Sequence, residues 1–213
     1  MYYCIICVVF TSSSSPFCTV SKVLIFGHSF VRRLKFDLIA NFEQRASRDF
    51  GLSGSAITYM HGVGGQRTVP KLRRHDLSLL SRILPDIVIL EIGTNDLSHS
   101  NPEVVGSEIE ELVRSLLEQI SVRIVGVCHV TPRDNHHALN RNFNTKALIL
   151  KQYVRVVLEH VEHVFCWTHK GFSNPSVTPF LSDVVHFNPV GQYNLYRSYR
   201  GAILTALSQL RAL

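Results

Sequence analysis

The sequence feature that most constrains the fold is an unbroken apolar run, Val23 to Phe26, that ends at a glycine and leads into a helical pattern. Such a run suits a strand that is buried on both faces of a parallel sheet. Gly27 permits a sharp turn, and apolar residues recur with a helical period from Phe30 to Phe42. The stretch therefore predicts a strand, a tight turn and a helix, with Ser29 at the helix start.

The rest of the chain repeats this alternation of apolar runs and amphipathic segments. We expect further strands at 56–60, 87–92, 122–129 and 161–167, and further helices at 70–83, 103–120, 140–158 and 191–213. Alternating strands and helices favour a parallel sheet that is covered on both faces. The predicted fold class is α/β, a three-layer α/β/α sandwich around a flavodoxin-like, five-stranded parallel sheet.

Length and composition indicate one folded domain. The 213 residues, 46% of them hydrophobic, allow one sizeable core. We expect residues 1–21 to form a loosely attached N-terminal extension and residues 22–213 to form the domain. The apolar residues 1–10 lack a basic leading region and are too few to span a bilayer, which needs ~20 residues. A secretory signal is therefore the less favoured interpretation.

Cysteine usage and charge bear on the compartment and on partners. The five cysteines are scattered, unlike a secreted disulfide framework, so we expect a cytoplasmic protein, with secretion as the alternative. The formal charge of +6 is concentrated at residues 32–35 and 71–75. Such clusters can contact phosphates, but they usually form solvated faces. Nucleic-acid binding is possible and less favoured, and the sequence leaves the oligomeric state open.

Several polar motifs follow the predicted strands, at the edge of a parallel sheet where ligands bind. The glycine block 62–65 and the segment Gly93 to Asp96 follow predicted strands, and a further motif, Asp183 with His186 three residues later, lies shortly before the last predicted helix. A serine at a helix start lies beside unpaired backbone N–H groups that can stabilise an oxyanion. In a turn, Asp183 can accept from one imidazole nitrogen of His186 while the other nitrogen faces Ser29, as a serine hydrolase requires.

Together with Gly27-His28-Ser29, these motifs resemble the four sequence blocks of the SGNH, or GDSL-type, hydrolases, from about Lys22 to the end of the chain. The resemblance implies the flavodoxin-like fold and hydrolysis of an ester bond by a serine hydrolase without metal or organic cofactor. It implies the catalytic residues Ser29, Asp183 and His186. The implied oxyanion hole consists of the Ser29 and Gly65 N–H groups and the Asn95 side chain.

One position departs from the family pattern, because His28 stands where these hydrolases usually have an aspartate before the serine. That aspartate is not the residue that orients the catalytic histidine. We therefore expect the departure to affect the efficiency more than the reaction class, and an aspartate at position 28 to be tolerated.

The predicted function is a serine esterase that hydrolyses a small O-acyl ester through an acyl-enzyme. The chain also resembles SGNH-like domains associated with some non-LTR retrotransposons, so the alternative is a weak or inactive SGNH-like binding domain near nucleic acid. Each motif also has a purely structural interpretation: Ser29 as a helix cap, Asn95 in an Asx-turn and Asp183 as a cap. At the same rim, Trp167 is a candidate wall of an acyl pocket, and Arg133 and His136-His137 are candidate substrate contacts.

Overall fold

The structure is a computed structural model that describes residues 20–40, 49–68, 74–133, 138–172, 179–183 and 185–213. Most of the expected N-terminal extension, most of the basic cluster 71–75 and His136-His137 lie outside the described residues. The first strand begins at Ser21, one residue before the expected start of the domain. The proposed division of the chain at residue 22 stays a prediction.

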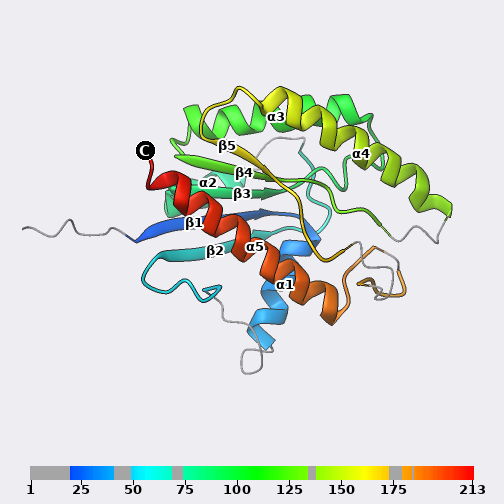
Figure 1. Ribbon diagram of the computed structural model, residues 1–213, viewed down its shortest axis with the longest axis horizontal. Coiled ribbons are helices and arrows are strands. Elements are labelled where there is room, and N and C mark those ends of the chain that lie inside the picture. The colour runs from blue at the N-terminus through cyan, green and yellow to red at the C-terminus, as the bar shows by residue number, and fades with distance from the viewer. Residues whose placement is uncertain (1–19, 41–48, 69–73, 134–137, 173–178, 184) are drawn as a thin grey trace, which may run out of the picture.

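Strands and helices alternate along the chain as the sequence predicts (Figure 1). The strands are β1 (Ser21–Gly27), β2 (Ala56–Gly62), β3 (Ile87–Glu91), β4 (Ile124–Cys128) and β5 (Val164–Trp167). The helices are α1 (Ser29–Ala40), α2 (Arg74–Ile83), α3 (Pro102–Glu118), α4 (Ala138–Leu158) and α5 (Pro189–Leu210). The strands pair in parallel in the order β2-β1-β3-β4-β5, which confirms the predicted flavodoxin-like sheet.

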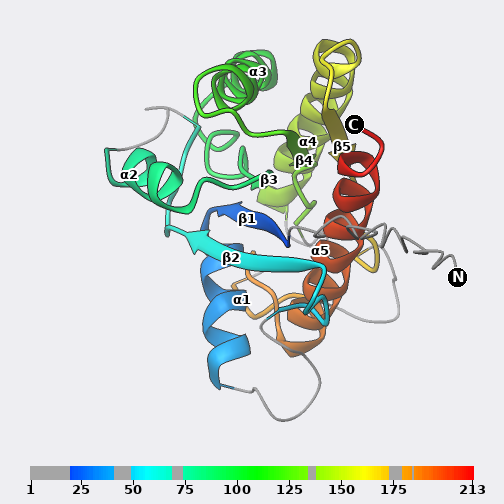
Figure 2. The ribbon, with the colours of Figure 1, turned by 90° about the vertical axis from the view of Figure 1, so that its left-hand side faces the viewer.

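Helices cover both faces of the sheet and give the predicted three layers (Figure 2). On one face, α1 and α5 pack against alternate residues of the central strands, including Ile25 and Ile89. On the other face, α2, α3 and α4 pack against the intervening residues, including Leu24 and Leu90. Because both faces are covered, the central strands are apolar without alternation, as their sequences indicate.

The last strand begins three residues later than the sequence predicts. Val161 instead belongs to a turn at the end of α4, where its N–H donates to the Leu158 carbonyl at 3.1 Å. His163 then adopts a positive φ of 65°, which is incompatible with an extended strand. The chain therefore becomes extended only at Val164.

The topology places a crevice at the carboxyl ends of β1 and β3. The chain leaves β1 for β2 on one side and returns to β3 on the other, and ligands bind at such switch points. Two glycines make the turn after β1 compact: a Cβ at Gly27 would overlap Glu91, and a Cβ at Gly62 would overlap the backbone of Arg32. Close packing therefore fixes the segment that carries Ser29.

The structure bears on two further features of the sequence. Cys128 and Cys166, the cysteines within the described residues, are free thiols. Within the same part of the chain, no helix has both the length and the apolar character that crossing a bilayer would require.

Candidate active site

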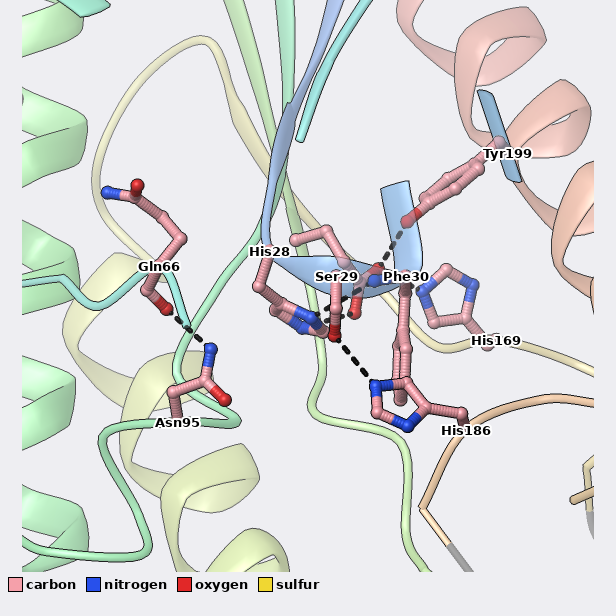
Figure 3. Close-up of polar contacts among 9 residues, drawn as sticks. His28, Ser29, Phe30, Gln66, Asn95, His169, His186 and Tyr199 are labelled. Atoms are coloured by element: carbon pink, nitrogen blue, oxygen red, sulfur yellow. Dashed lines mark hydrogen bonds and ion pairs between the residues drawn. The ribbon is translucent and has the colours of Figure 1, made fainter. Parts of the chain in front are cut away.

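Ser29, His186 and Asp183 form a continuous chain of hydrogen bonds at the start of α1. The Nε2 atom of His186 lies 3.3 Å from Ser29 Oγ (Figure 3), and its Nδ1 atom lies 2.7 Å from Asp183 Oδ2. Ser29 and His186 are 157 residues apart in the sequence. The structure thus brings together the three residues that the sequence predicts to be catalytic.

Asp183 is oriented by its own loop. Its Oδ1 atom accepts hydrogen bonds from the backbone N–H groups of Val185 at 3.0 Å and His186 at 2.8 Å. Burial raises the pKa of Asp183, but these bonds and the bond from the imidazole outweigh burial and lower it to about 2. Asp183 is therefore ionised at neutral pH and can hold the proton of His186 at Nδ1, which leaves Nε2 as the acceptor toward Ser29.

The aspartate and histidine remain open to solvent while aromatic packing supports their loop. The side chains of Asp183 and His186 are 46% and 24% exposed. Beneath them, the ring of Phe187 contacts that of Phe30 with 4.3 Å between centroids. A substrate can therefore reach the imidazole from solvent, while Phe30 ties the loop to the helix that carries Ser29.

Asn95 lies on the other side of Ser29 from His186 in Figure 3. Its Nδ2 atom donates to the Gln66 carbonyl at 2.7 Å, so a contact across 29 residues orients the amide. One of its two N–H groups is used in this bond. The structural interpretation of Asn95 as only a local Asx-turn is therefore insufficient, and its role as an oxyanion donor stays a prediction.

The glycine block lies beside the nucleophile because Val63 N–H donates to the Gly27 carbonyl at 3.0 Å. Gly65 has a positive φ of 70°, a backbone conformation that favours glycine. A Cβ at this position would meet nothing within 4 Å, so the conformation and not a lack of space favours glycine here. Nearby, Asp96 accepts from the N–H of Thr68 at 3.0 Å. This bond joins the segment after β3 to the segment that follows the glycine block, and Gly65 stays a predicted oxyanion donor.

His28 lies in a buried environment that bears on the expectation that aspartate is tolerated at this position. Its side chain is fully buried, its Nδ1 accepts from Phe30 N–H at 3.4 Å, and its Nε2 lies 3.7 Å from Glu91 Oε1. An aspartate here would bury a second carboxylate beside Glu91. The expectation that aspartate is tolerated at position 28 is therefore reversed, and we expect this substitution to destabilise the fold.

Glu91 is the centre of a buried cluster that sequence reasoning missed. The carboxylate is 1% exposed, and its Oε2 accepts from His169 Nε2 at 2.6 Å and from Tyr199 OH at 2.9 Å. Burial raises the pKa of Glu91, but His169, His28 and Tyr199 outweigh burial and hold it below its ordinary value. A glutamate within an otherwise apolar strand is the one sequence signal that could have drawn attention to Glu91, although it does not identify the partners of Glu91.

Two other rim predictions can be compared with the structure. Trp167 donates from Nε1 to Ser198 Oγ at 2.9 Å and packs against Gly201 of α5, which favours its interpretation as structural cover. Arg133 stacks on the Phe143 ring, with its guanidinium carbon 3.7 Å from the centroid. Its backbone N–H donates to Asn144 Oδ1 at 2.8 Å, so Arg133 is held in place by α4.

One group of described side chains has the composition of a metal site. Possible ligand atoms of Glu91, Cys128 and His169 lie within 4.8 Å of one another, and all three residues are buried. Direct hydrogen bonds from His169 and Tyr199 already engage Glu91 Oε2. These contacts account for the buried charge of Glu91, so we assign the group to the hydrogen-bonded cluster.

The buried histidine makes stability depend on pH. Burial lowers the pKa of His28 from 6.5 to about 4, so the unfolded chain binds this proton more readily than the folded protein. The free energy of unfolding should therefore fall as pH decreases from about 6.5 to 4, by about 3 kcal/mol at most from His28. His129, whose pKa burial also lowers to about 4, should add a further loss over the same pH range.

Urea unfolding of the wild type and His28→Asn between pH 4 and 7 checks this prediction. Asparagine retains an acceptor for Phe30 N–H and cannot titrate, so the variant should show a shallower pH dependence. Equal slopes for the two proteins would show that His28 does not resist protonation in the folded state.

Comparison with known proteins identifies the family. Residues 25–193 match the model of the GDSL-like Lipase/Acylhydrolase family. The chain is 29% identical over 154 residues to platelet-activating factor acetylhydrolase IB subunit alpha1 of Rattus norvegicus. The matched residues cover 70% of this chain and 64% of the relative. The human protein of that name is 28% identical over 154 residues, with the same coverage. The chain thus spans less than two thirds of the length of these relatives.

Solved structures share the fold at low sequence identity. An acetyl esterase mutant with an acetate ion has a TM-score of 0.66 at 15% identity, covering 90% of this chain and 100% of the other. A GDSL-like lipase from Bacteroides thetaiotaomicron has a TM-score of 0.63 at 17% identity, with coverages of 87% and 89%. Because the family model spans most of the sequence, from β1 into α5, the chain belongs to the GDSL-like lipase/acylhydrolase family.

Proposed function

We propose that this protein is a serine esterase that hydrolyses a small O-acyl ester through an acyl-enzyme intermediate. The observation that carries the proposal is the hydrogen-bonded chain from Ser29 through His186 to Asp183, with distances of 3.3 and 2.7 Å. A nucleophile, a base and a group that orients the base are the parts required for acyl transfer to serine.

In the first step, Ser29 Oγ attacks the ester carbonyl while His186 Nε2 accepts the hydroxyl proton. The tetrahedral intermediate collapses, His186 returns the proton to the leaving alcohol, and the acyl group remains on Ser29. Water then attacks the acyl-enzyme as His186 again accepts a proton; the second intermediate collapses, His186 returns this proton to Ser29 Oγ, and the carboxylic acid is released. Asp183 remains ionised throughout and stabilises the imidazolium that forms in each step.

The oxyanion forms at the N-terminal end of α1, where backbone N–H groups and the helix dipole favour negative charge. We assign its donors to the N–H groups of Ser29 and Gly65 and to the side chain of Asn95. The bond from Asn95 to the Gln66 carbonyl supports this assignment, because it holds the amide in place before substrate binds. Such preorganisation is what makes an oxyanion donor effective.

The names of similar proteins support a short acyl group. They include a platelet-activating factor acetylhydrolase subunit and an acetyl-xylooligosaccharide esterase from Geobacillus, the latter with a TM-score of 0.61 at 15% identity and coverages of 88% and 94%. We therefore propose that the substrate is an ester whose acyl group is acetyl or similarly small. The alcohol is left open by this reasoning.

Hydrolysis of p-nitrophenyl acetate, butyrate and octanoate tests both parts of the proposal. The wild type should have its highest kcat/KM for acetate, and Ser29→Ala should lower kcat by ~10⁴-fold or more because the acyl-enzyme cannot form. Ser107→Ala, at an exposed position in α3, is the matched control and should retain wild-type rates.

Two results would contradict the proposal. Hydrolysis of p-nitrophenyl acetate that persists in Ser29→Ala would exclude Ser29 as the nucleophile. A higher kcat/KM for p-nitrophenyl octanoate than for the acetate ester would exclude a preference for small acyl groups. A well-folded wild type without turnover on any of the esters would favour the alternative of a ligand-binding SGNH-like domain.

A further inference from the structure

We propose that Glu91 is a positioning residue for the nucleophile, acting through His28 to hold the turn that carries Ser29. Among the described residues, no hydrogen bond joins either side chain to the Ser29 hydroxyl; each side chain is about 1% exposed, and His28 directly precedes Ser29 in the turn. The proposal rests on the proposed function, because it assigns Glu91 to the reactivity of Ser29. The effect of Glu91 on the structure of the turn can be measured without any catalytic turnover.

Glu91 is surrounded by hydrogen-bond donors. His169 and Tyr199 donate to Oε2 at 2.6 and 2.9 Å, and the thiol sulfur of Cys128 lies within 4.8 Å of the carboxylate. The phenol of Tyr199 remains protonated, because burial, followed by the charge of Glu91, raises its pKa well above the ordinary value. The second carboxylate oxygen, Oε1, faces His28 Nε2 at 3.7 Å. Glu91 is thus a fixed anion with one oxygen toward the nucleophile turn.

The contacts of His28 require one tautomer. Its Nδ1 accepts a hydrogen bond from the N–H of Phe30 at 3.4 Å, so that nitrogen carries no proton. The remaining proton is on Nε2, which has no hydrogen-bond partner among the described residues and whose nearest anion is Glu91. The negative charge of Glu91 favours this N–H, and the N–H in turn leaves Nδ1 free to accept from Phe30. The side chain of His28 therefore connects Glu91 to the first turn of α1.

The backbone makes the same connection. His28 N–H donates to the Glu91 carbonyl at 3.3 Å, and the His28 carbonyl accepts from Arg32 N–H at 3.2 Å in the first turn of α1. There is no room for a Cβ at Gly27 beside Glu91. The residue directly before Ser29 is consequently bonded to the end of β3 by its main chain, and its side chain faces Glu91 Oε1 at 3.7 Å.

A second layer of contacts fixes Glu91 from the opposite side. His169 Nδ1 lies 2.8 Å from Ser198 Oγ, and the same oxygen accepts from Trp167 Nε1 at 2.9 Å. Figure 3 shows His169 and Tyr199 on the side of the turn away from Asn95. The cluster thus joins β3, β5 and α5 beneath Ser29, and a change at Glu91 should be transmitted to the nucleophile through His28.

The experiment is the substitution Glu91→Gln, measured by NMR in ¹⁵N-histidine-labelled and uniformly ¹⁵N-labelled protein at neutral pH. In the wild type, His28 should be the neutral tautomer with its proton on Nε2, and the spectrum of His28→Asn identifies its signals. Both carboxylate oxygens of Glu91 face donors: His169 and Tyr199 at Oε2, and His28 Nε2 at Oε1. In glutamine an NH₂ group replaces one of these oxygens, so this group would face an N–H or O–H donor. We expect the proton of His28 or His169 to change nitrogen and the amide signals of Ser29 and Phe30 to shift.

Kinetics on p-nitrophenyl acetate give the second readout. Glu91→Gln should lower kcat by roughly 10- to 100-fold, because small displacements of a nucleophile are costly, and change KM by less than about twofold, because Glu91 touches no substrate. Glu118→Gln, at an exposed position in α3, is the matched control and should change neither kcat nor the spectra. If Glu91→Gln does not fold, Tyr199→Phe removes one hydrogen bond to Glu91 and should shift the same signals.

The inference is overturned if a folded Glu91→Gln, or Tyr199→Phe in its place, leaves the histidine tautomers and the Ser29 and Phe30 amides unchanged. It is also overturned if kcat is unchanged or if only KM rises. An inactive wild type would reject the proposed function instead, and the NMR comparison would still decide whether Glu91 positions the turn.

Discussion

Replacing Asp183 with asparagine should lower kcat for p-nitrophenyl acetate by ~10⁴-fold while the protein stays folded. Asparagine keeps the size of the side chain but removes the charge that stabilises the imidazolium. Its amide can also donate to Nδ1 of His186, which would place the imidazole proton on Nε2, toward Ser29. With its proton on Nε2, the imidazole could no longer accept the proton of Ser29.

The measurement is kcat/KM as a function of pH for the wild type and Asp183→Asn. Ser182→Ala, a neighbouring exposed position in the same loop, is the matched control and should retain activity. If a folded Asp183→Asn kept its activity, another group would orient His186, or this histidine would not be the base.

Replacing Asn95 with alanine should lower kcat by ~10²- to 10³-fold with a small change in KM, because one oxyanion donor contributes roughly 3 kcal/mol in a preorganised site. The variant also loses the 2.7 Å bond to Gln66. The melting temperature must therefore be measured beside kcat, so that a displaced loop can be recognised as a loss of stability.

Asn101→Ala is a suitable control for Asn95, because Asn101 is an exposed N-cap residue of α3 whose side chain makes no capping hydrogen bond. This variant should match the wild type in rate and nearly in stability. Wild-type kcat in a folded Asn95→Ala would assign Asn95 to the structure of the loop and leave the oxyanion to backbone donors alone.

The fold was predictable because its signals are local. The segment at residues 87–91, apolar except for Glu91, has the length of a strand and is buried at every position, and helical periods separate it from its neighbours. The alternation of strands and helices predicts a parallel sheet with right-handed crossovers, and the order of the strands is what the resemblance to the SGNH hydrolases implies. The start of β5 was missed by three residues, because the apolar Val161 continues the pattern although it lies in a turn.

The catalytic candidates were predictable for a different reason. Ser29, Asp183 and His186 stand in short motifs at the ends of predicted elements, and the topology of a parallel sheet brings such ends together. The partner of Asn95 was not predictable, because the Gln66 carbonyl is a backbone atom that carries no sequence signal.

The cluster around Glu91 shows what sequence reasoning could not reach. Its contacts join Glu91 to His169 across 78 residues and to Tyr199 across 108 residues, and no local pattern relates these positions. His28 was misjudged for the same reason. Its position before the serine was evident, but its burial beside a carboxylate depends on how β1 and β3 pack.

Covalent labelling by a fluorophosphonate probe, with the modified peptide identified by mass spectrometry, tests the central claim most directly. The probe reacts with a serine whose hydroxyl is activated by a neighbouring base. We predict one adduct per chain, located on Ser29, absent in Ser29→Ala and strongly reduced in a folded His186→Ala. A folded wild type that is not labelled, or an adduct on any other residue, would contradict the assignment of Ser29 as the nucleophile.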